Sequence, residues 1–360
     1  MKNKITLQNG GETAAITRAQ TIKLGLDVHA DSIVVVRIID GQGPQPAQHF
    51  SPESFLEWAQ KQLGVAEKVY ACYEAGPFGY GLQRTLTKLE LTCYVVRPRD
   101  WDQYGSQVKT DKRDAHELAL CLDRYVSGNT KAFSLVRVPT HEQEQARSLT
   151  RHRQSLLNQK QRLAAQGRGH ALYYGYRLRG EWWKPGAWAE LRRSLPAHLL
   201  RLLSSLRKLI AVAEKELQTF TREIEQSAAA EPLPQGVGKL TAQVLEREVS
   251  DWSRFKNRRQ VASYTGLCPS EESSGPHRFQ GSVTKHGNRR LRPVLVECAW
   301  RLTRFQSRYR LVQKWRPLLS DPKATKARRK KIIVAMARQF AVDWWRIRTG
   351  RVTAQSLGLV

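Results

Sequence analysis

The sequence predicts an α/β domain in its first third and an all-α region with a coiled coil after it. From Ile22 onward, stretches rich in Val and Ile alternate with amphipathic stretches, which is typical of strands alternating with helices. From His141 onward, apolar residues recur at helical spacing instead. The charge balance changes near the same place. The sequence therefore divides into two regions of different architecture.

The chain has 360 residues and a net charge of +28. Residues 1–135 carry 16 Lys or Arg and 15 Asp or Glu, which leaves 44 basic and 17 acidic residues for 136–360. The first third is nearly neutral and the rest is a polycation. A basic surface kept for solubility is one explanation. A net +27 over residues 136–360 favours contact with the phosphates of nucleic acid.

The cysteines and the hydropathy argue against a disulfide-bonded, zinc-binding, secreted or membrane-spanning protein. The five cysteines form no CxxC pair and have no histidine cluster at zinc spacing, so we expect reduced thiols in a cytoplasmic protein. Residues 1–20 lack the apolar core of a signal peptide. No apolar run reaches the ~18 residues of a membrane span. A soluble protein with no membrane partner is expected.

The first region, residues 21–138, follows a polar extension at residues 1–20. Its opening stretch, IKLGLDVHADSIVVVRIID, predicts a hairpin of two strands. The stretch FSPESFLEWAQKQL predicts a helix capped at Ser51 or Ser54. The strands KVYACYEA and TCYVVRP flank a helix at GYGLQRTLTKLEL, and TDKRDAHELALCLDRYV predicts a strongly amphipathic helix.

Residues 139–230 predict a helical coiled-coil region. A long polar helix covers 141–166, and the aromatic, Gly- and Pro-containing segment 173–196 predicts a packed turn or short helices. A heptad seam of alternating steps of four and three residues follows, at Leu199, Leu203, Leu206, Ile210, Ala213, Leu217, Phe220 and Ile224. Its partner is either the helix at 141–166 or a second chain.

Residues 231–360 predict further helices. EPLPQGVGKLTAQVLEREV resembles a helix-hairpin-helix element, whose backbone N–H groups bind a phosphate, although a plain turn between helices has the same pattern. Residues 252–305 form a mixed, Arg-rich region. The basic run KATKARRKK leads into a C-terminal helix within residues 321–360, which contains Trp344 and Trp345.

Four carboxylates in the neutral region have the spacing of a metal site. Asp27 lies within a predicted strand, and Glu74 follows the apolar run VYACY. Asp111 and Asp114 share the first turn of a predicted helix. A ribonuclease-H-like fold places its acids in this way, and two-metal phosphoryl transfer needs such convergence. Mg²⁺ prefers these oxygen ligands.

Each acid also has a structural explanation. Asp111 or Asp114 would serve equally well as a helix cap or a partner of the helix dipole. Asp27 would be a turn residue if the hairpin boundary were different, and Glu74 an ordinary loop acid. Their joint occurrence in the neutral region favours metal binding. Further acids nearby are weaker candidates: Asp31, Asp100, Asp102 and Asp123.

Four segments carry a resemblance to a known family. LGLDVHADSIVV, YEAGPFGYGL, VVRPRDWDQYGSQVKTDKRDAHELA and GLCPSEESSGPHRFQGSVTKHGNRRLRPVLVECAW resemble the DEDD-type insertion-sequence transposases, also called RNA-guided bridge recombinases. The resemblance spans residues 22–305, and its most specific parts are KTDxxDA and GLxP…SG…TKxGNxxLR.

The resemblance implies a RuvC-like (ribonuclease-H-like) domain whose catalytic tetrad falls on Asp27, Glu74, Asp111 and Asp114. It also implies a coiled-coil insertion and a transposase domain, residues 231–320, with a nucleophilic serine in the SG motif. Ser274 matches that serine best, with Ser273 as the alternative. The two domains would meet across protomers of a dimer or tetramer.

The chemistry of a serine nucleophile suits strand exchange. A phosphoserine ester keeps the energy of the broken phosphodiester, but a free hydroxyl needs a base or a metal to activate it. His277 is the one evident base near Ser274. Basic residues around the KHGN turn would contact phosphates: Arg278, Lys285, Arg289, Arg290 and Arg292.

Three functions are therefore compatible with the sequence. The first is an RNA-guided transposase that uses Mg²⁺, double-stranded DNA and a structured noncoding guide RNA. The second is a hydrolytic Holliday-junction resolvase-like nuclease that uses only the four carboxylates. The third is a non-catalytic nucleic-acid-binding protein in which the acids are structural.

Overall fold

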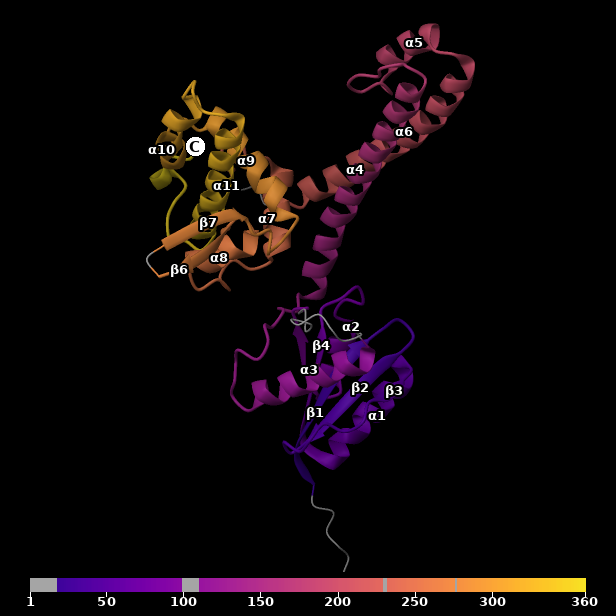
Figure 1. The fold of residues 1–360 in the computed structure, drawn as a ribbon, viewed down its shortest axis with the longest axis vertical. Helices are drawn as coiled ribbons and strands as arrows, with labels where there is room; N and C mark the ends of the chain where they lie inside the picture. Colours follow the sequence, from indigo (N-terminus) through magenta and orange to yellow (C-terminus); the bar gives the residue numbers. More distant parts are fainter. Residues whose placement is uncertain (1–17, 99–109, 229–231, 276) are drawn as a thin grey trace, which may run out of the picture. The chain divides into compact units, whose positions relative to one another are not determined.

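The Val- and Ile-rich stretch that begins near Ile22 forms the first two strands of a sheet in the computed structural model (Figure 1). β1 (Ala19–Val28) pairs antiparallel with β2 (Ile33–Ile39), which confirms the predicted hairpin. The structure describes residues 18–98, 110–228, 232–275 and 277–360. Most of the predicted extension at residues 1–20, together with Asp100 and Asp102, lies outside these ranges.

Three further strands complete the sheet: β3 (Gln48–Phe50), β4 (Ala66–Glu74) and β5 (Thr92–Val96). The strand order is β3-β2-β1-β4-β5, and β1, β4 and β5 run parallel. The carboxyl ends of these three parallel strands therefore meet at one edge of the sheet. β3 was not predicted, because three residues are too few to show an alternation.

Helices cover both faces of the sheet. α1 (Pro52–Val65) and α2 (Gly81–Lys88) pack on the face to which alternate residues of β1 point, as the buried cluster of Leu24, Leu26, Phe55 and Leu86 shows. The Ser51 hydroxyl accepts the backbone N–H of Ser54 and caps α1.

α3 (Asp111–Val126) covers the other face, where Ala115 and Ala119 pack against Val34 and Val36. The first region is thus a mixed α/β fold, as predicted. Asp123 has a structural role here, because its carboxylate lies 2.7 Å from the ammonium of the buried Lys23.

The chain separates into two compact units, Met1–Val138 and Pro139–Val360. The second unit begins with an arm made of α4 (His141–Tyr173), α5 (Pro185–Ser194) and α6 (Ala197–Gln226). Figure 1 shows α4 and α6 side by side along most of their length, with α5 at the far end.

The heptad seam lies on α6 and is buried at every position except Phe220, which is half-buried. The ring of Phe220 contacts that of His152 on α4, with 4.8 Å between their centroids. α4 is therefore the partner of the seam, which decides between the two alternatives that the sequence left open.

The rest of the second unit is a helical body, and its elements are α7 (Lys239–Val249), α8 (Arg258–Thr265), β6 (Pro269–Ser274), β7 (His277–Val283), α9 (Leu291–Phe305), α10 (Arg310–Ser320), α11 (Lys326–Arg348) and η1 (Gln355–Leu357). One buried cluster runs from Val237 to Leu359 and includes Trp344 and Trp345. The C-terminal helix thus packs in the same core as α7 and α9.

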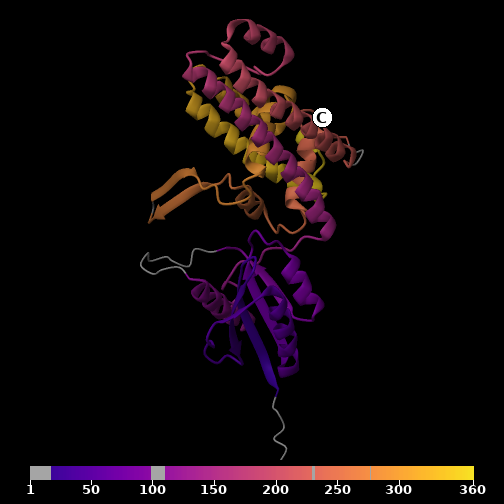
Figure 2. The same ribbon diagram turned by 90° about the vertical axis from the view of Figure 1, so that its right-hand side faces the viewer.

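The strands β6 and β7 form a hairpin that the sequence did not predict. Figure 2 shows it as orange arrows projecting from the helices. The segment SEESSGP looks like a flexible loop because its side chains are polar on both faces, and the exposure of β6 explains this composition. Among the described residues, no helix is long and apolar enough to cross a membrane.

The five cysteines are unpaired, and four of them are buried. This matches the expectation of reduced thiols that pack as small apolar groups.

Candidate active site

Gly25 on β1 allows α3 to cross the strand close to Asp27. Gly25 and Asp27 are two residues apart, so they face the same side of the sheet. A Cβ at Gly25 would lie 2.8 Å from the Cα of Ala119, and closer still to the backbone oxygen of Ala115. Real Cβ atoms essentially never lie within 3.0 Å of another heavy atom of this kind. Only glycine therefore permits this packing of α3 on β1.

The first turn of α3 carries the two neighbouring acids. Thr110 is the N-cap, with φ −141° and ψ 145°, Asp111 is the first helical residue, and Asp114 lies one turn on. The N-cap position is therefore not occupied by either acid. Both still interact favourably with the positive end of the helix dipole.

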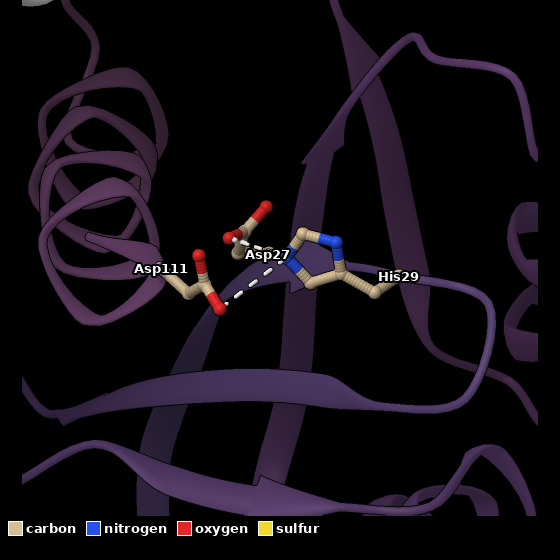
Figure 3. Close-up of side chains that lie close together, drawn as sticks. All are labelled: Asp27, His29 and Asp111. Carbon is tan, nitrogen blue, oxygen red and sulfur yellow. Dashed lines mark hydrogen bonds and ion pairs between the residues drawn. The ribbon is translucent and has the colours of Figure 1, made fainter. Parts of the chain in front are cut away.

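Asp27, His29 and Asp111 converge at this point (Figure 3). Nε2 of His29 lies 3.2 Å from Oδ2 of Asp27 and 3.5 Å from Oδ2 of Asp111. Burial raises the pKa of Asp27, the charge and hydrogen bond of His29 oppose this, and the charges of Asp111 and Asp114 raise it further. Asp114 therefore belongs to the same electrostatic cluster.

The donor set fits a divalent cation. One ligand atom from each of Asp27, His29 and Asp111 lies within 4.8 Å of the others. Carboxylate oxygens suit Mg²⁺, and the imidazole nitrogen also suits transition metals. A cation among these groups would offset the repulsion that Asp111 and Asp114 exert on Asp27. The side chain of Asp111 is 57% exposed, so the cluster is open to a substrate.

Glu74 ends the strand next to Asp27. Leu26 pairs with Tyr73 in the parallel register, so Asp27 and Glu74 are the next residues on the two strands and face the same side. Glu74 is half-buried and lies outside the cluster of three residues. The structure thus brings Asp27, Asp111 and Asp114 together and places Glu74 at the same edge of the sheet.

His29 was not among the residues predicted from the sequence. It directly follows β1, and its backbone N–H donates to the carbonyl of Ser32 in the turn to β2. The available signal was its spacing: two residues after Asp27 in an extended chain, a side chain returns to the same face. A histidine in a turn has many explanations, so the spacing alone did not single it out.

Ser274 lies in the second unit, as the last residue of β6, and pairs with His277 across the hairpin. Residues directly opposite in antiparallel strands share a face, with Cβ atoms about 5 Å apart. Ser273 points to the other face, where its hydroxyl donates to Oε1 of Glu271 at 3.0 Å. The two candidate serines therefore have different surroundings.

The five basic residues predicted to contact phosphates differ in whether their side chains already bind other groups of the protein. Arg278 lies 2.7 Å from Glu271, and the guanidinium of Arg292 donates to the carbonyl of Lys285 at 2.8 Å. Lys285 and Arg289 are exposed. Arg290 is half-exposed and lies 3.9 Å from the carboxylate of Glu248.

The KHGN turn has a structural explanation. A Cβ at Gly287 would lie 2.6 Å from the carbonyl oxygen of Tyr264, and Gly287 has φ +145°. The side chain of Asn288 accepts the backbone N–H of Arg290 and donates to Glu248 at 2.9 Å. The turn is thereby held against α8 and the start of α9.

Glu248 on α7 joins this turn to the arm. Its side chain is 1% exposed and accepts two hydrogen bonds from Arg151 of α4, at 2.9 and 3.0 Å. Burial alone would raise the pKa of Glu248, but the hydrogen bonds from Arg151 and Asn288 and the charges of Arg151 and Arg290 outweigh it and lower the pKa. Sequence patterns did not point to this residue.

Comparison with known families matches both units. The profile of DEDD-type IS110 transposases matches residues 24–174, which include the four predicted carboxylates. The profile of the IS116/IS110/IS902 transposase family matches residues 234–313, which include Ser274 and the basic residues near it.

Three relatives also resemble the chain. The protein y4rJ of Sinorhizobium fredii, which bears a transposase name, is 31% identical over 76% of this chain and 75% of its own length. The similarly named y4qE of the same species is 34% identical over 65% of this chain and 58% of its own length, which is under two thirds of that relative. The transposase for insertion sequence element IS1533 of Leptospira borgpetersenii is 26% identical over 78% of this chain and 84% of its own length.

Proposed function

This chain belongs to the IS116/IS110/IS902 family of DEDD transposases, and from that membership we propose that it is an RNA-guided DNA recombinase. In this proposal the carboxylates of the first unit and Ser274 of the second unit cut and rejoin DNA strands. The observation that carries the proposal is the convergence of Asp27, His29 and Asp111.

The carboxylates would hold Mg²⁺. Asp27 and Asp111 would be ligands, Asp114 and Glu74 would add negative charge at the same edge, and His29 would orient both aspartates. When bound, the metal would stabilise charge on the attacking and leaving oxygens. The chain's own contribution is to hold these side chains on a rigid strand and helix.

Ser274 would be the nucleophile. Its Oγ would form a bond to the DNA phosphorus as the bond from phosphorus to one deoxyribose oxygen breaks, and the departing oxygen would take up a proton. The reverse step, with a different strand's hydroxyl, completes the exchange without an external energy source. His277, the residue paired with Ser274 across the hairpin, would accept the proton of Ser274, whereas the hydroxyl of Ser273 already donates to Glu271.

A structured noncoding RNA would select the DNA. Support comes from the net +27 of residues 136–360 and from the exposed Lys285 and Arg289. Phosphate contacts of this kind position a nucleic acid without reading its sequence, so sequence choice falls to base pairing with a guide. Sequencing of RNA that copurifies with the full chain tests this. Loss of target choice after RNase treatment is expected, and unchanged target choice would exclude the guide.

Aspartate and serine variants test the chemistry. Asp27→Asn and Asp111→Asn are each expected to lower strand cleavage at least 100-fold by removing transition-state stabilisation. Glu117→Gln, an exposed acid of the same helix, is the matched control and is expected to cleave normally. Normal cleavage by both aspartate variants would exclude either enzymatic function.

The serine step has its own readout. A covalent protein–DNA adduct is expected from the wild type and from Ser273→Ala, and none from Ser274→Ala. Cleavage by Ser274→Ala at the wild-type rate, without any adduct, would instead establish the hydrolytic nuclease.

The active species would be a dimer or tetramer. α6 carries an exposed apolar stripe outside its buried seam, at Leu202, Leu209 and Val212, which suits contact with a second copy. Mixing Asp27→Asn with Ser274→Ala tests whether one chain's carboxylates serve another chain's serine. Partial recovery of strand exchange is expected, and a mixture as inactive as each variant alone would exclude a shared site.

A further inference from the structure

A cleft in the second unit lies between the turn that precedes α7 and the end of α9. Its volume is about 660 Å³. Residues 233–238 form one wall, and the other wall is formed by Trp300, Arg301, Arg304 and Phe305. The strand-exchange chemistry proposed above uses none of these residues.

The aromatic wall is not part of the core. Trp300 is 48% exposed and Phe305 is 50% exposed, whereas Ala299 and Leu302 on the opposite face of α9 are fully buried. Burial of large aromatic side chains is among the strongest sources of folding free energy. Two exposed rings in one cleft therefore indicate a ligand with a flat, apolar face.

The same wall is cationic. The guanidinium of Arg304 lies 5.5 Å from the centre of the Phe305 ring. Arg301 pairs with Glu297 at 3.0 Å, but both side chains are about half-exposed or more, so water screens this pair. Among the described residues that line the cleft, none is acidic. A ligand that carries phosphate next to a flat ring matches these walls.

The cleft is formed in advance of binding. Gly236 has φ +93°, and a Cβ there would lie 3.4 Å from the backbone of Arg301, so the turn is in van der Waals reach of α9. The buried Gln306 donates from Nε2 to the carbonyl of Gln235 at 3.0 Å and holds the turn in place. A rigid cleft loses little conformational entropy when it binds a ligand.

We propose that this cleft binds an unpaired segment of nucleic acid, with its bases packed against both Trp300 and Phe305 and the adjoining phosphates at Arg301 and Arg304. The inference rests on the proposed function only in taking nucleic acid as the substrate. A duplex keeps the faces of its bases stacked inside, so these rings can meet a base only where it is unpaired.

The test measures nucleic-acid binding by the full-length chain in EDTA, which removes divalent metal and so prevents metal-dependent cleavage. The probes are single-stranded DNA, single-stranded RNA and duplex DNA of equal length, each with one fluorescent adenine analogue. Trp300→Ala and Phe305→Ala are each expected to weaken single-strand binding about tenfold and to remove the fluorescence quenching that stacking causes. Duplex binding is expected to stay unchanged.

Two further variants separate stacking from folding. Trp300→Leu keeps the apolar bulk but not the flat ring, and it is expected to lose affinity as Trp300→Ala does. Leu318→Ala removes an exposed apolar side chain of α10 outside the cleft and is expected to bind as the wild type does.

Single-strand binding that is unchanged in Trp300→Ala and Phe305→Ala would overturn the proposal, and so would equal loss for single strands and duplex. The DNA and RNA probes show which strand the cleft prefers. Because the assay needs no catalytic carboxylate, normal cleavage by both Asp27→Asn and Asp111→Asn would exclude the proposed chemistry without affecting this result.

Discussion

The missing side chain of Gly25 and the backbone of Ala119 define how closely α3 approaches β1. A Cβ at position 25 would lie 2.8 Å from the Cα of Ala119, although the two residues are far apart in the sequence. The approach matters for chemistry because Asp27 follows on the same strand and Asp111 begins the same helix. Packing in the core thus determines the distance between two acids at the surface.

Gly25→Ala is expected to push α3 outward. Overpacking of this kind costs about 1–3 kcal/mol of unfolding free energy. Displacement of Asp111 should in addition weaken metal binding and so lower the rate of metal-dependent cleavage. Urea unfolding and a metal titration of cleavage measure the two effects. Gly64→Ala, where a Cβ meets no atom, is the control. Wild-type metal affinity in Gly25→Ala would show that α3 does not set the site.

His29→Ala is expected to weaken divalent-metal binding about 10- to 100-fold, because residues that orient metal ligands contribute on that scale. The imidazole touches both aspartates, so its loss frees each to turn away. Calorimetric titration with Mg²⁺ and Mn²⁺ measures the change. The exposed His49→Ala of β3 is the control. Equal metal affinities of the wild type, His29→Ala and His49→Ala would show that His29 has no role in metal binding.

Glu248→Gln is expected to destabilise the second unit by about 3 kcal/mol at neutral pH, since the Arg151 guanidinium then loses its buried counter-charge. Arg151 is 38% exposed and partly hydrated, which places the loss at the low end of the range for broken buried pairs. Urea unfolding of the variant and the wild type at pH 7 measures it.

The same pair predicts a pH dependence. The folded-state pKa of Glu248 is lowered, so its contribution to stability is fully present above the usual glutamate value of about 4.3 and is lost as the pH falls through the lower folded value. The stability difference between the wild type and Glu248→Gln should therefore be constant from pH 7 to about pH 5 and shrink below pH 4. A difference that is as large at pH 2 as at pH 7 would contradict this.

Leu203→Ala in the buried seam of α6 is expected to cost about 2–5 kcal/mol of unfolding free energy, as large-to-small core substitutions do. Leu209→Ala on the same helix removes a side chain that is 52% exposed and should leave monomer stability nearly unchanged. Thermal unfolding and sedimentation distinguish them. A change in the mass of the assembly in Leu203→Ala alone would contradict a seam that is closed within one chain.

Local periodicity predicted most of the first unit and the arm. The β1–β2 hairpin, the helix that starts at Asp111 and the seam from Leu199 to Ile224 each bury one face, and burial on one face leaves a repeat of two or three to four residues in the sequence. The β6–β7 hairpin escaped prediction because both its faces are largely exposed, so burial imposes no repeat on it.

The sequence by itself determined the α/β region, the coiled-coil arm and the distribution of charge, and it indicated Asp27, Glu74, Asp111 and Asp114 as candidate metal ligands. The tertiary structure alone decided that His29 joins two of those acids, that α4 covers the seam, and that Glu248 connects the arm to the KHGN turn. The physical reason is the range of the interactions. Periodicity records which face of one element is buried, whereas contacts between residues distant in the chain depend on how whole elements pack.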